Sequence, residues 1–291
     1  MERVAIVGLG AMGRGIAANL LGKGRAVAVY NRTSGRADGL TGDLTVAASP
    51  AAAAKGAAFV VTMVADDAAA LGVTEGKDGV LAGMGPEAIH ISMSTIGVAA
   101  ARDLAARHAA AGRQFVSAPV FGRPPVAAEG KLRLAVAGAP GAVERCRPLL
   151  EQMGQNVFVI ADKPEQANLV KLAGNVAIAA MAETLAETFT LVGKSGIDRA
   201  KFLELITTVF ASPLYTTYAT IMQQEKFDTN GFKLKLAYKD LGLAQAAAAT
   251  AEVPMPLLAS VQGQLLAGMA QGLGDLDLTA VARVVGANAG L

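Results

Sequence analysis

The stretch VAIVGLGAMG, residues 4–13, decides the fold of the N-terminal half of the chain. Residues 4–7 are apolar and predict a buried strand, and the apolar pattern of 11–21 predicts a helix. Between them the sequence fits G-x-G-x-x-G, a turn in which backbone N–H groups at a helix start face a pyrophosphate. This context predicts dinucleotide contacts from Gly8, Leu9, Gly10, Ala11, Met12 and Gly13. The alternative is a glycine-rich turn without a ligand.

Further apolar runs follow at the spacing of alternating strands and helices. Residues 97–111 read as a helix that ends at Gly112. The strands are expected at 26–30, 57–63, 89–93, 114–116, 132–137 and 157–160. Such alternation predicts a doubly wound, mostly parallel sheet.

The pattern changes after residue 161, where strand-like runs stop. A helix at about 164–192 is expected to join two domains, 1–162 and 163–291, and 291 residues are enough for two. The second domain is expected to be all-α. Its helices are expected at 200–209, 214–225, 232–251, 255–271 and 278–285. This half carries more apolar surface than one small domain hides, which favours a homodimer or homotetramer.

Composition narrows the class of protein. Apolar residues make up 53% of the chain, charged residues 17%, and the net charge is only +2 without a basic run, so nucleic acid is not an expected partner. One cysteine and two separated histidines, His90 and His108, give no metal-binding spacing. No uninterrupted apolar stretch of membrane-spanning length and no signal-peptide pattern are seen. We expect a cytoplasmic protein without metal or membrane partners.

Three of these side chains are expected to be structural. His108 lies near a helix end, where a positive charge is favourable. His90 lies within a strand, and Cys146 stands between two arginines with no base beside it.

The end of the second strand favours one of the two nicotinamide dinucleotides. An NAD site normally has a carboxylate there for the ribose 2′-hydroxyl. Here the residues are Asn31, Arg32 and Thr33. A guanidinium can pair with a 2′-phosphate, so we expect NADP(H) to be preferred over NAD(H). The alternative is that Arg32 is a solvated turn residue.

Ligands of open α/β sheets bind beyond the carboxyl ends of the strands. Two segments there become cofactor-binding candidates. Met63, Val64 and Ala65 follow one strand with apolar side chains, and Ser94 and Thr95 follow another with hydroxyls. The alternative for the hydroxyls is a cap on the following helix, a role compatible with binding.

Lys171 and Asn175 are four residues apart on the long predicted helix and share one face. A lysine among apolar residues is costly unless it is solvated or paired. Lysine can protonate the alkoxide that forms when hydride reaches a carbonyl. Lys171 is therefore the candidate general acid, and the alternative is a lysine that extends to water.

Taken together, these motifs resemble the β-hydroxyacid dehydrogenase family, and the resemblance covers essentially the whole chain. The family includes 3-hydroxyisobutyrate dehydrogenases and glyoxylate/succinic semialdehyde reductases. The similar segments are Gly-Leu-Gly-x-Met-Gly at 8–13, Asn31-Arg32-Thr33, Ser94-Thr95-Ile96, Lys171-x-x-x-Asn175 and Lys239-Asp240-Leu241. The resemblance implies a Rossmann domain and a helical domain. It also implies Lys171 as acid/base, Asn175 as a substrate contact and Lys239 near nicotinamide and substrate.

The substrate loop departs from the family's Asp-Ala-Pro-Val-Ser-Gly-Gly. This chain reads Ser-Ala-Pro-Val-Phe-Gly-Arg at 117–123. Phe121 stands where the family has serine and Arg123 where it has the second glycine. Ser117, Gly122 and Arg123 remain substrate-binding candidates, with Arg123 as a possible carboxylate fork. The alternative is a pocket for bulkier, less charged substrates.

The leading hypothesis is an NADPH-dependent reductase of small aldehydes or oxo acids, reversibly a 3-hydroxy acid dehydrogenase. The first alternative is an imine reductase with an altered substrate loop, although such enzymes typically lack the lysine. The second is a non-catalytic NADP(H)-binding protein, which would need neither Lys171 nor Asn175 nor Lys239.

Overall fold

The computed structural model describes residues 2–229 and 231–291. The chain divides into two compact units, unit 1 at Met1–Lys171 and unit 2 at Leu172–Leu291. Unit 1 carries all the named strands, and unit 2 is helical. The expected fold class, a Rossmann-type α/β region followed by an all-α region, is confirmed.

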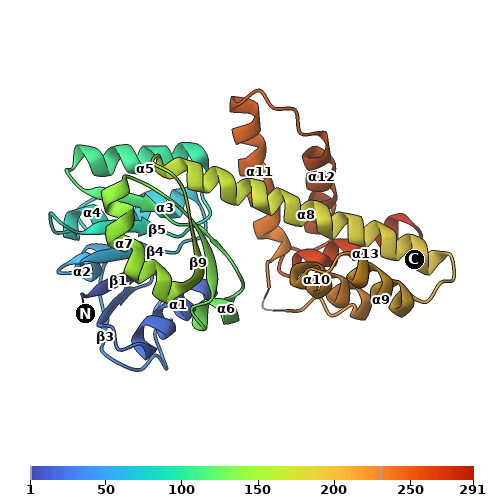
Figure 1. Cartoon of the computed structure of the whole chain (residues 1–291), viewed down its shortest axis with the longest axis horizontal. Helices are drawn as coiled ribbons and strands as arrows, with labels where there is room; N and C mark the ends of the chain where they lie inside the picture. The colour runs from blue at the N-terminus through green and yellow to red at the C-terminus, as the bar shows by residue number, and fades with distance from the viewer. Residues whose placement is uncertain (1, 230) are drawn as a thin grey trace. The chain divides into compact units, whose positions relative to one another are not determined.

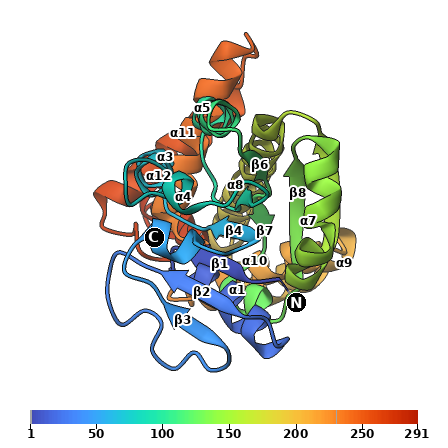
Figure 2. The same cartoon turned by 90° about the vertical axis from the view of Figure 1, so that its left-hand side faces the viewer.

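One mixed sheet of nine strands forms the centre of unit 1 (Figure 2). Its order is β3-β2-β1-β4-β5-β6-β8-β7, and β9 also pairs with β8. The strands β1 to β6 run parallel to one another. Their bounds are β1 Val4–Val7, β2 Val27–Tyr30, β3 Leu44–Val46, β4 Phe59–Thr62, β5 Ile89–Ser92, β6 Gln114–Ser117, β7 Val120–Phe121, β8 Leu132–Ala137 and β9 Gly154–Ala161.

Helices cover both faces of this sheet because alternate strand residues point to opposite sides (Figure 1). Ile6 and Val29 face the core shared with α1 (Ala11–Gly22) and α7 (Pro140–Met153). Ala5 and Val60 face the opposite side, where α2 and α4 pack. The remaining helices of unit 1 are α2 Pro50–Ala54, α3 Asp67–Thr74, α4 Val80–Gly83, α5 Val98–Ala110 and α6 Pro124–Ala128.

Two short strands were not foreseen from the sequence. β3 has three residues and β7 has two, too few to show a period. β7 and β6 both pair antiparallel with β8, so the sheet is parallel only in its larger part. The pairing of β7 with β8 sets Phe121 opposite Arg133. It thereby fixes the backbone of the substrate loop beside β8.

The helix α8 (Pro164–Lys194) begins in unit 1 and continues into unit 2. It extends two residues beyond the expected end. Proline at the first turn begins α8, α10 and α12, where the missing N–H costs nothing. The other elements of unit 2 are α9 Arg199–Val209, α10 Pro213–Gln224, α11 Leu234–Thr250, α12 Pro256–Ala270, the 3₁₀ turn Leu278–Ala280 and α13 Val281–Asn288. In Figure 1, α11 and α12 run side by side as a hairpin.

Within the described parts of the chain, α8 is also the one helix long and apolar enough to cross a membrane by length and composition. From the sequence no apolar stretch of this length was expected without a glycine or polar break, and α8 contains such breaks. In its most apolar 18-residue window, 44% is buried inside the protein. A buried core helix passes the same test, so this property alone does not indicate a membrane.

Candidate active site

The turn between β1 and α1 has the backbone of a phosphate-binding loop. Gly8 has φ +101°, a conformation that L side chains rarely adopt. A Cβ on Gly13 would overlap the carbonyl oxygen of Gly8, whereas nothing lies within 4 Å of the position that a Cβ on Gly10 would take. The N-cap residue of α1 is Gly10, which has no side chain. The first N–H groups of α1 therefore receive no hydrogen bond from an N-cap side chain. These features fit a dinucleotide pyrophosphate.

Asn31 ties the second predicted cofactor segment to this turn. Its Oδ1 accepts a hydrogen bond from the Leu9 N–H at 2.8 Å, and its Nδ2 donates to the Thr33 carbonyl at 2.9 Å. Arg32 and Thr33 are exposed at the end of β2. The structure thus gives Asn31 a shaping role and leaves the Arg32 side chain at the surface beside the turn.

The ends of β4 and β5 are joined through Ser94. Its hydroxyl accepts a hydrogen bond from the Val64 N–H at 2.8 Å and lies 3.4 Å from the Thr62 carbonyl. The N-cap of α5 is Gly97, which has no side chain. The alternative that Ser94 or Thr95 caps this helix is therefore wrong, because α5 begins two residues later than a cap at Thr95 would require.

Asn168 is a residue that the sequence analysis missed. It is buried on α8, and its Nδ2 lies 3.4 Å from the Ile96 carbonyl and 3.5 Å from that of Ser94. The side chain thereby holds the first turns of α8 at the carboxyl end of β5. The signal was present in the spacing, since 168, 171 and 175 follow the three-and-four rhythm of one helix face.

Lys171 lies on this face and is only 7% exposed. Its Nζ lies 3.9 Å from the centroid of the Phe121 ring, a cation–π contact. The expected alternative, a lysine extended into water, does not describe this side chain. Asn168 and Phe121 place Lys171 beside the carboxyl ends of β5 and β6, the edge where such sheets bind ligands.

The loop after β6 is shaped by backbone constraints. Ser117 is fully buried, and its hydroxyl has no hydrogen-bond partner among residues 2–229 and 231–291. Gly122 has φ +151°, and a Cβ there would lie 2.7 Å from Leu132 Cδ2. Arg123 is the half-buried N-cap residue of α6. A polar atom buried without a partner is a place where a ligand or water can bind.

In unit 2, Asn175 donates from Nδ2 to Asp240 Oδ2 at 2.6 Å. Asp240 is 2% exposed on α11 and pairs with Lys239 at 3.0 Å. Asn175 and Lys239 were candidates from the sequence, whereas Asp240 had no assigned role there. In the structure its carboxylate fixes the Asn175 amide and neutralises the charge of Lys239. Only the fold reveals it, because Asn175 and Asp240 are 65 residues apart.

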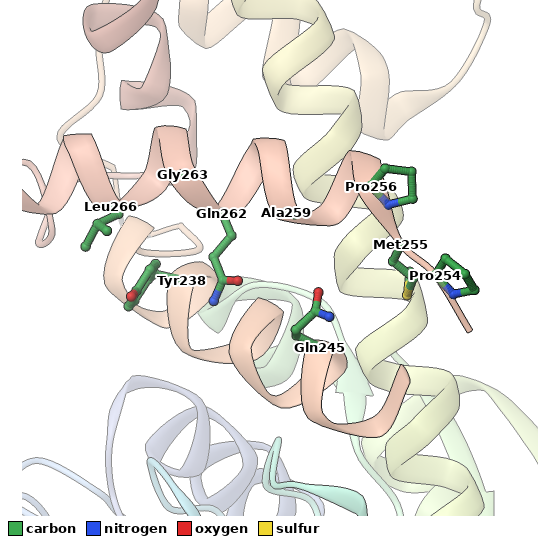
Figure 3. Close-up of a pocket in the computed structure, with 9 residues that line it drawn as sticks. All are labelled: Tyr238, Gln245, Pro254, Met255, Pro256, Ala259, Gln262, Gly263 and Leu266. Carbon is green, nitrogen blue, oxygen red and sulfur yellow. The ribbon is translucent and has the colours of Figure 1, made fainter. Parts of the chain in front are cut away.

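Two surface cavities of unit 2 contain none of the residues singled out from the sequence. A cavity of about 700 Å³ lies between α11 and α12, where Tyr238, Gln245 and Gln262 line it (Figure 3). A second, of about 500 Å³, is lined by Arg199, Glu225 and Arg283, among others. Within the described ranges, no group of three metal-ligating side chains is found.

The comparisons with known proteins agree with these features. Residues 3–161 match the family described as the NAD binding domain of 6-phosphogluconate dehydrogenase. Residues 166–285 match the NAD-binding region of NADP-dependent 3-hydroxyisobutyrate dehydrogenase.

Three curated relatives match along almost their whole length. The uncharacterized oxidoreductase YfjR of Bacillus subtilis is 40% identical over 97% of this chain and 99% of that protein. Glyoxylate/succinic semialdehyde reductase 1 of Arabidopsis thaliana is 30% identical over 97% of this chain and 98% of its own. The NAD-dependent L-serine dehydrogenase of Pseudomonas aeruginosa is 31% identical over 98% of each.

Among solved structures, 3-hydroxyisobutyrate dehydrogenase from Salmonella typhimurium is similar with a TM-score of 0.87 at 26% identity, over 98% of this chain and all of that one. The fold, both family matches and the full-length relatives therefore agree. The chain belongs to the β-hydroxyacid dehydrogenase family and is an NAD(P)-dependent oxidoreductase of the hydroxyacid dehydrogenase/reductase type that acts on CH–OH groups.

Proposed function

We propose that the protein is an NADP(H)-dependent reductase of small aldehydes and oxo acids of the glyoxylate or succinic semialdehyde type, and reversibly a 3-hydroxy acid dehydrogenase. The observation that carries the proposal is the burial of Lys171 at the ligand-binding edge of the sheet. A buried ammonium is costly, and this cost is repaid where a reaction needs both a proton donor and a positive charge.

The chemistry divides between cofactor and protein. The reduced nicotinamide, when bound, supplies the hydride that the carbonyl carbon receives. Lys171 donates a proton from Nζ to the carbonyl oxygen, and its charge stabilises the oxyanion while the proton moves. In the reverse direction the neutral amine accepts the proton from the hydroxyl group.

The remaining polar residues are proposed to orient the substrate. Asn175 presents an amide whose orientation the 2.6 Å bond to Asp240 fixes. The buried Ser117 hydroxyl, the Gly122 backbone and the Arg123 guanidinium are proposed to bind the polar end of the substrate, and Lys239 to lie near nicotinamide and substrate. Pre-organised partners of this kind lower the cost of reaching the reactive geometry.

The preference for NADP(H) is supported by Arg32 and by the absence of a carboxylate among residues 30–33. For Arg32→Ala we expect NADPH to bind about 10- to 100-fold more weakly and NADH to bind nearly unchanged, because only NADPH loses a charged hydrogen bond. Dissociation constants of both cofactors test this. The matched control is Arg147→Ala on α7, whose guanidinium pairs with Glu144 at 2.7 Å. Tighter binding of NADH by the unaltered protein would contradict the preference.

The substrate class is tested by following cofactor oxidation at 340 nm. The panel contains glyoxylate, succinic semialdehyde, a neutral aldehyde and a cyclic imine, each with NADPH and with NADH. A preference for the carboxylates supports the proposal. Activity on the imine alone would favour the imine reductase alternative, and binding of NADPH without turnover of any carbonyl would favour a non-catalytic protein.

A homo-oligomer is proposed as the working form. Unit 2 leaves large apolar side chains at its surface, and a second copy of the chain is the proposed cover. They are Leu205, Val209, Phe210 and Leu214 around α9 and α10, and Leu257, Leu266 and Met269 on α12. A molar mass from light scattering equal to one chain would contradict this. The cytoplasmic location expected from the sequence stays a prediction.

A further inference from the structure

The substrate loop places an aromatic ring against the lysine. Phe121 lies on β7, where antiparallel pairing sets it opposite Arg133 on β8. The next residue, Gly122, has a φ of +151° that disfavours other residues, so the loop turns at once after the ring. The Phe121 ring is therefore held by the sheet, with its centroid 3.9 Å from Lys171 Nζ.

Burial and the ring act on the ammonium in opposite directions. Lys171 is 7% exposed, and loss of water favours the neutral amine. An aromatic face attracts a cation through its quadrupole and does not attract an amine in the same way. The ring thus favours the protonated form where burial disfavours it.

Within unit 1, charged side chains stand on the same helix as Lys171 and on the loop that carries Phe121. On α8, Glu165 pairs with Arg102 at 3.3 Å. The loop that carries Phe121 continues to Arg123, which does not favour an additional cation. The Glu165 carboxylate is thus shared with another cation.

We infer that Phe121 is a positioning residue for the reaction: its ring keeps the Lys171 ammonium protonated and aimed. This inference rests on the proposed role of Lys171 as the acid. On this inference, phenylalanine in place of the family's serine stabilises the Lys171 ammonium, because a serine hydroxyl has no aromatic face that attracts a cation.

The direction of the pH effect follows from the two roles of the lysine. Reduction needs the ammonium, and oxidation needs the amine. If Phe121→Leu removes the aromatic face, the ammonium releases its proton at a lower pH. The basic limb of kcat/KM for reduction and the acidic limb for oxidation should then both move to lower pH, by about 0.5 to 1.5 pH units.

The experiment compares three variants in both directions across pH, with unfolding of each measured first. Phe121→Leu should move both limbs, and Phe121→Tyr, which keeps an aromatic face, should restore them. The matched control is Phe158→Leu, an exposed ring on β9 of the same unit, which should leave both limbs unmoved. A Phe121→Leu enzyme that is slower by the same factor at every pH would overturn the inference.

A second measurement separates this inference from the proposed function. The protein is labelled with ¹³C at lysine Cε, and the Lys171 signal is assigned by its loss in Lys171→Met. In Phe121→Leu the signal should titrate at a lower pH than in the unaltered protein, and no movement overturns the inference. An active Lys171→Met enzyme refutes the proposed acid, and the titration then still decides whether the ring stabilises the ammonium.

Discussion

Two of the places where unit 1 buries basic side chains treat a proton in opposite ways. His90 on β5 and His108 on α5 are both fully enclosed, with His90 Nδ1 lying 2.8 Å from His108 Nε2. Lys171 on α8 is nearly as buried, and its ammonium lies over the Phe121 ring. The two histidines lie in the interior between β5 and α5. Lys171 lies at the carboxyl edge of the sheet.

The histidines form a closed chain of hydrogen bonds. The Leu104 carbonyl can only accept, so His108 Nδ1, 2.7 Å away, carries a proton. In the neutral ring, His108 Nε2 then accepts from His90 Nδ1. In turn His90 Nε2 accepts from the Thr62 hydroxyl at 2.9 Å. Every partner is satisfied while both rings are neutral.

Burial gives the same answer for the charge. It lowers the pKa of His108 to about 4, and it lowers the pKa of His90 well below the ordinary value, with the neighbouring His108 as the second cause. The expectation that His108 is favoured as a cation at its helix end is therefore wrong. Removal from water outweighs the helix dipole, whose effect is typically below 1 kcal/mol at the surface. Cys146 is similarly inert, because burial raises its pKa to about 12.

A structural basic group and a candidate catalytic one differ here in the partners that surround them. The histidines have partners that need no proton to enter or leave. Lys171 has an aromatic face that favours the charged form, at the edge of the sheet where α/β folds of this kind bind their ligands.

The largest effect is expected on activity. Lys171→Met should lower kcat/KM for carbonyl reduction by about 100- to 10,000-fold, the range typical of a general acid. Lys163→Met, an exposed lysine just before α8, is the control and should change little. His108→Gln should stay within about threefold of the unaltered enzyme, since the pair takes no part in the reaction. A large loss in His108→Gln would break the comparison.

The next effect is on stability in acid. An unfolded imidazole binds a proton near pH 6.5, and folded His108 does so only near pH 4. The stability that the neutral ring contributes is therefore present above pH 6.5 and is lost as the pH falls towards 4, by about 2.5 kcal/mol between pH 7.5 and 4.5. Urea unfolding at the two pH values measures it. His108→Gln should reduce this loss, and Ala109→Gln, an exposed neighbour on α5, should not. An equal loss in all three proteins would show that the pair does not titrate as inferred.

A smaller effect of opposite sign is expected in unit 2. Burial, together with the charge of Glu187, raises the pKa of Glu183 on α8 to about 7. The unfolded acid ionises near 4.5, so this site disfavours folding as the pH rises from 4.5 to 7 and above. Glu183→Gln should stabilise the protein at pH 8 by about 1–2 kcal/mol, a value reduced for partial solvation. At pH 4.5 the gain should vanish.

The control for that variant is Glu204→Gln on α9, an exposed glutamate of the same unit. It should change stability by less than about 0.5 kcal/mol, as is usual for surface substitutions. Urea midpoints at pH 4.5 and pH 8 compare the three proteins. A gain from Glu183→Gln that is the same at both pH values would indicate a packing effect and not titration.

Much of the fold could be predicted because its signals are local. Most strands of unit 1 and the helices of unit 2 follow from periodicity that each segment carries by itself. β3 and β7 escaped because two or three residues show no period, and their pairing partners lie elsewhere in the chain. The end of the strand pattern just before α8 could be seen in the sequence. The compact units, however, divide inside this helix, between Lys171 and Leu172.

The candidate site was predictable to a smaller extent. Chemically distinctive residues such as Lys171, Asn175 and Arg32 could be singled out by type and spacing. Asn168 could have been found by the same helical spacing. Phe121 was noted only as a departure from the family's serine, because a sequence does not show that its ring meets a lysine 50 positions later. Lys171 and Asn175 lie one turn apart on α8. The Phe121 ring that Lys171 contacts and the Asp240 carboxylate that Asn175 contacts come from distant segments of the chain.

The sequence by itself determined the phosphate-binding turn, since a positive φ at Gly8 and the close approach at Gly13 are demands on single residues with no side chain. It also determined the order of strands and helices through their periods. Only the tertiary structure decided the partners of buried charge: His90 with His108 across 18 residues, Asn175 with Asp240 across 65, and Lys171 with Phe121. The physical reason is that burial and contact set whether a side chain keeps its proton, and both are properties of the folded chain.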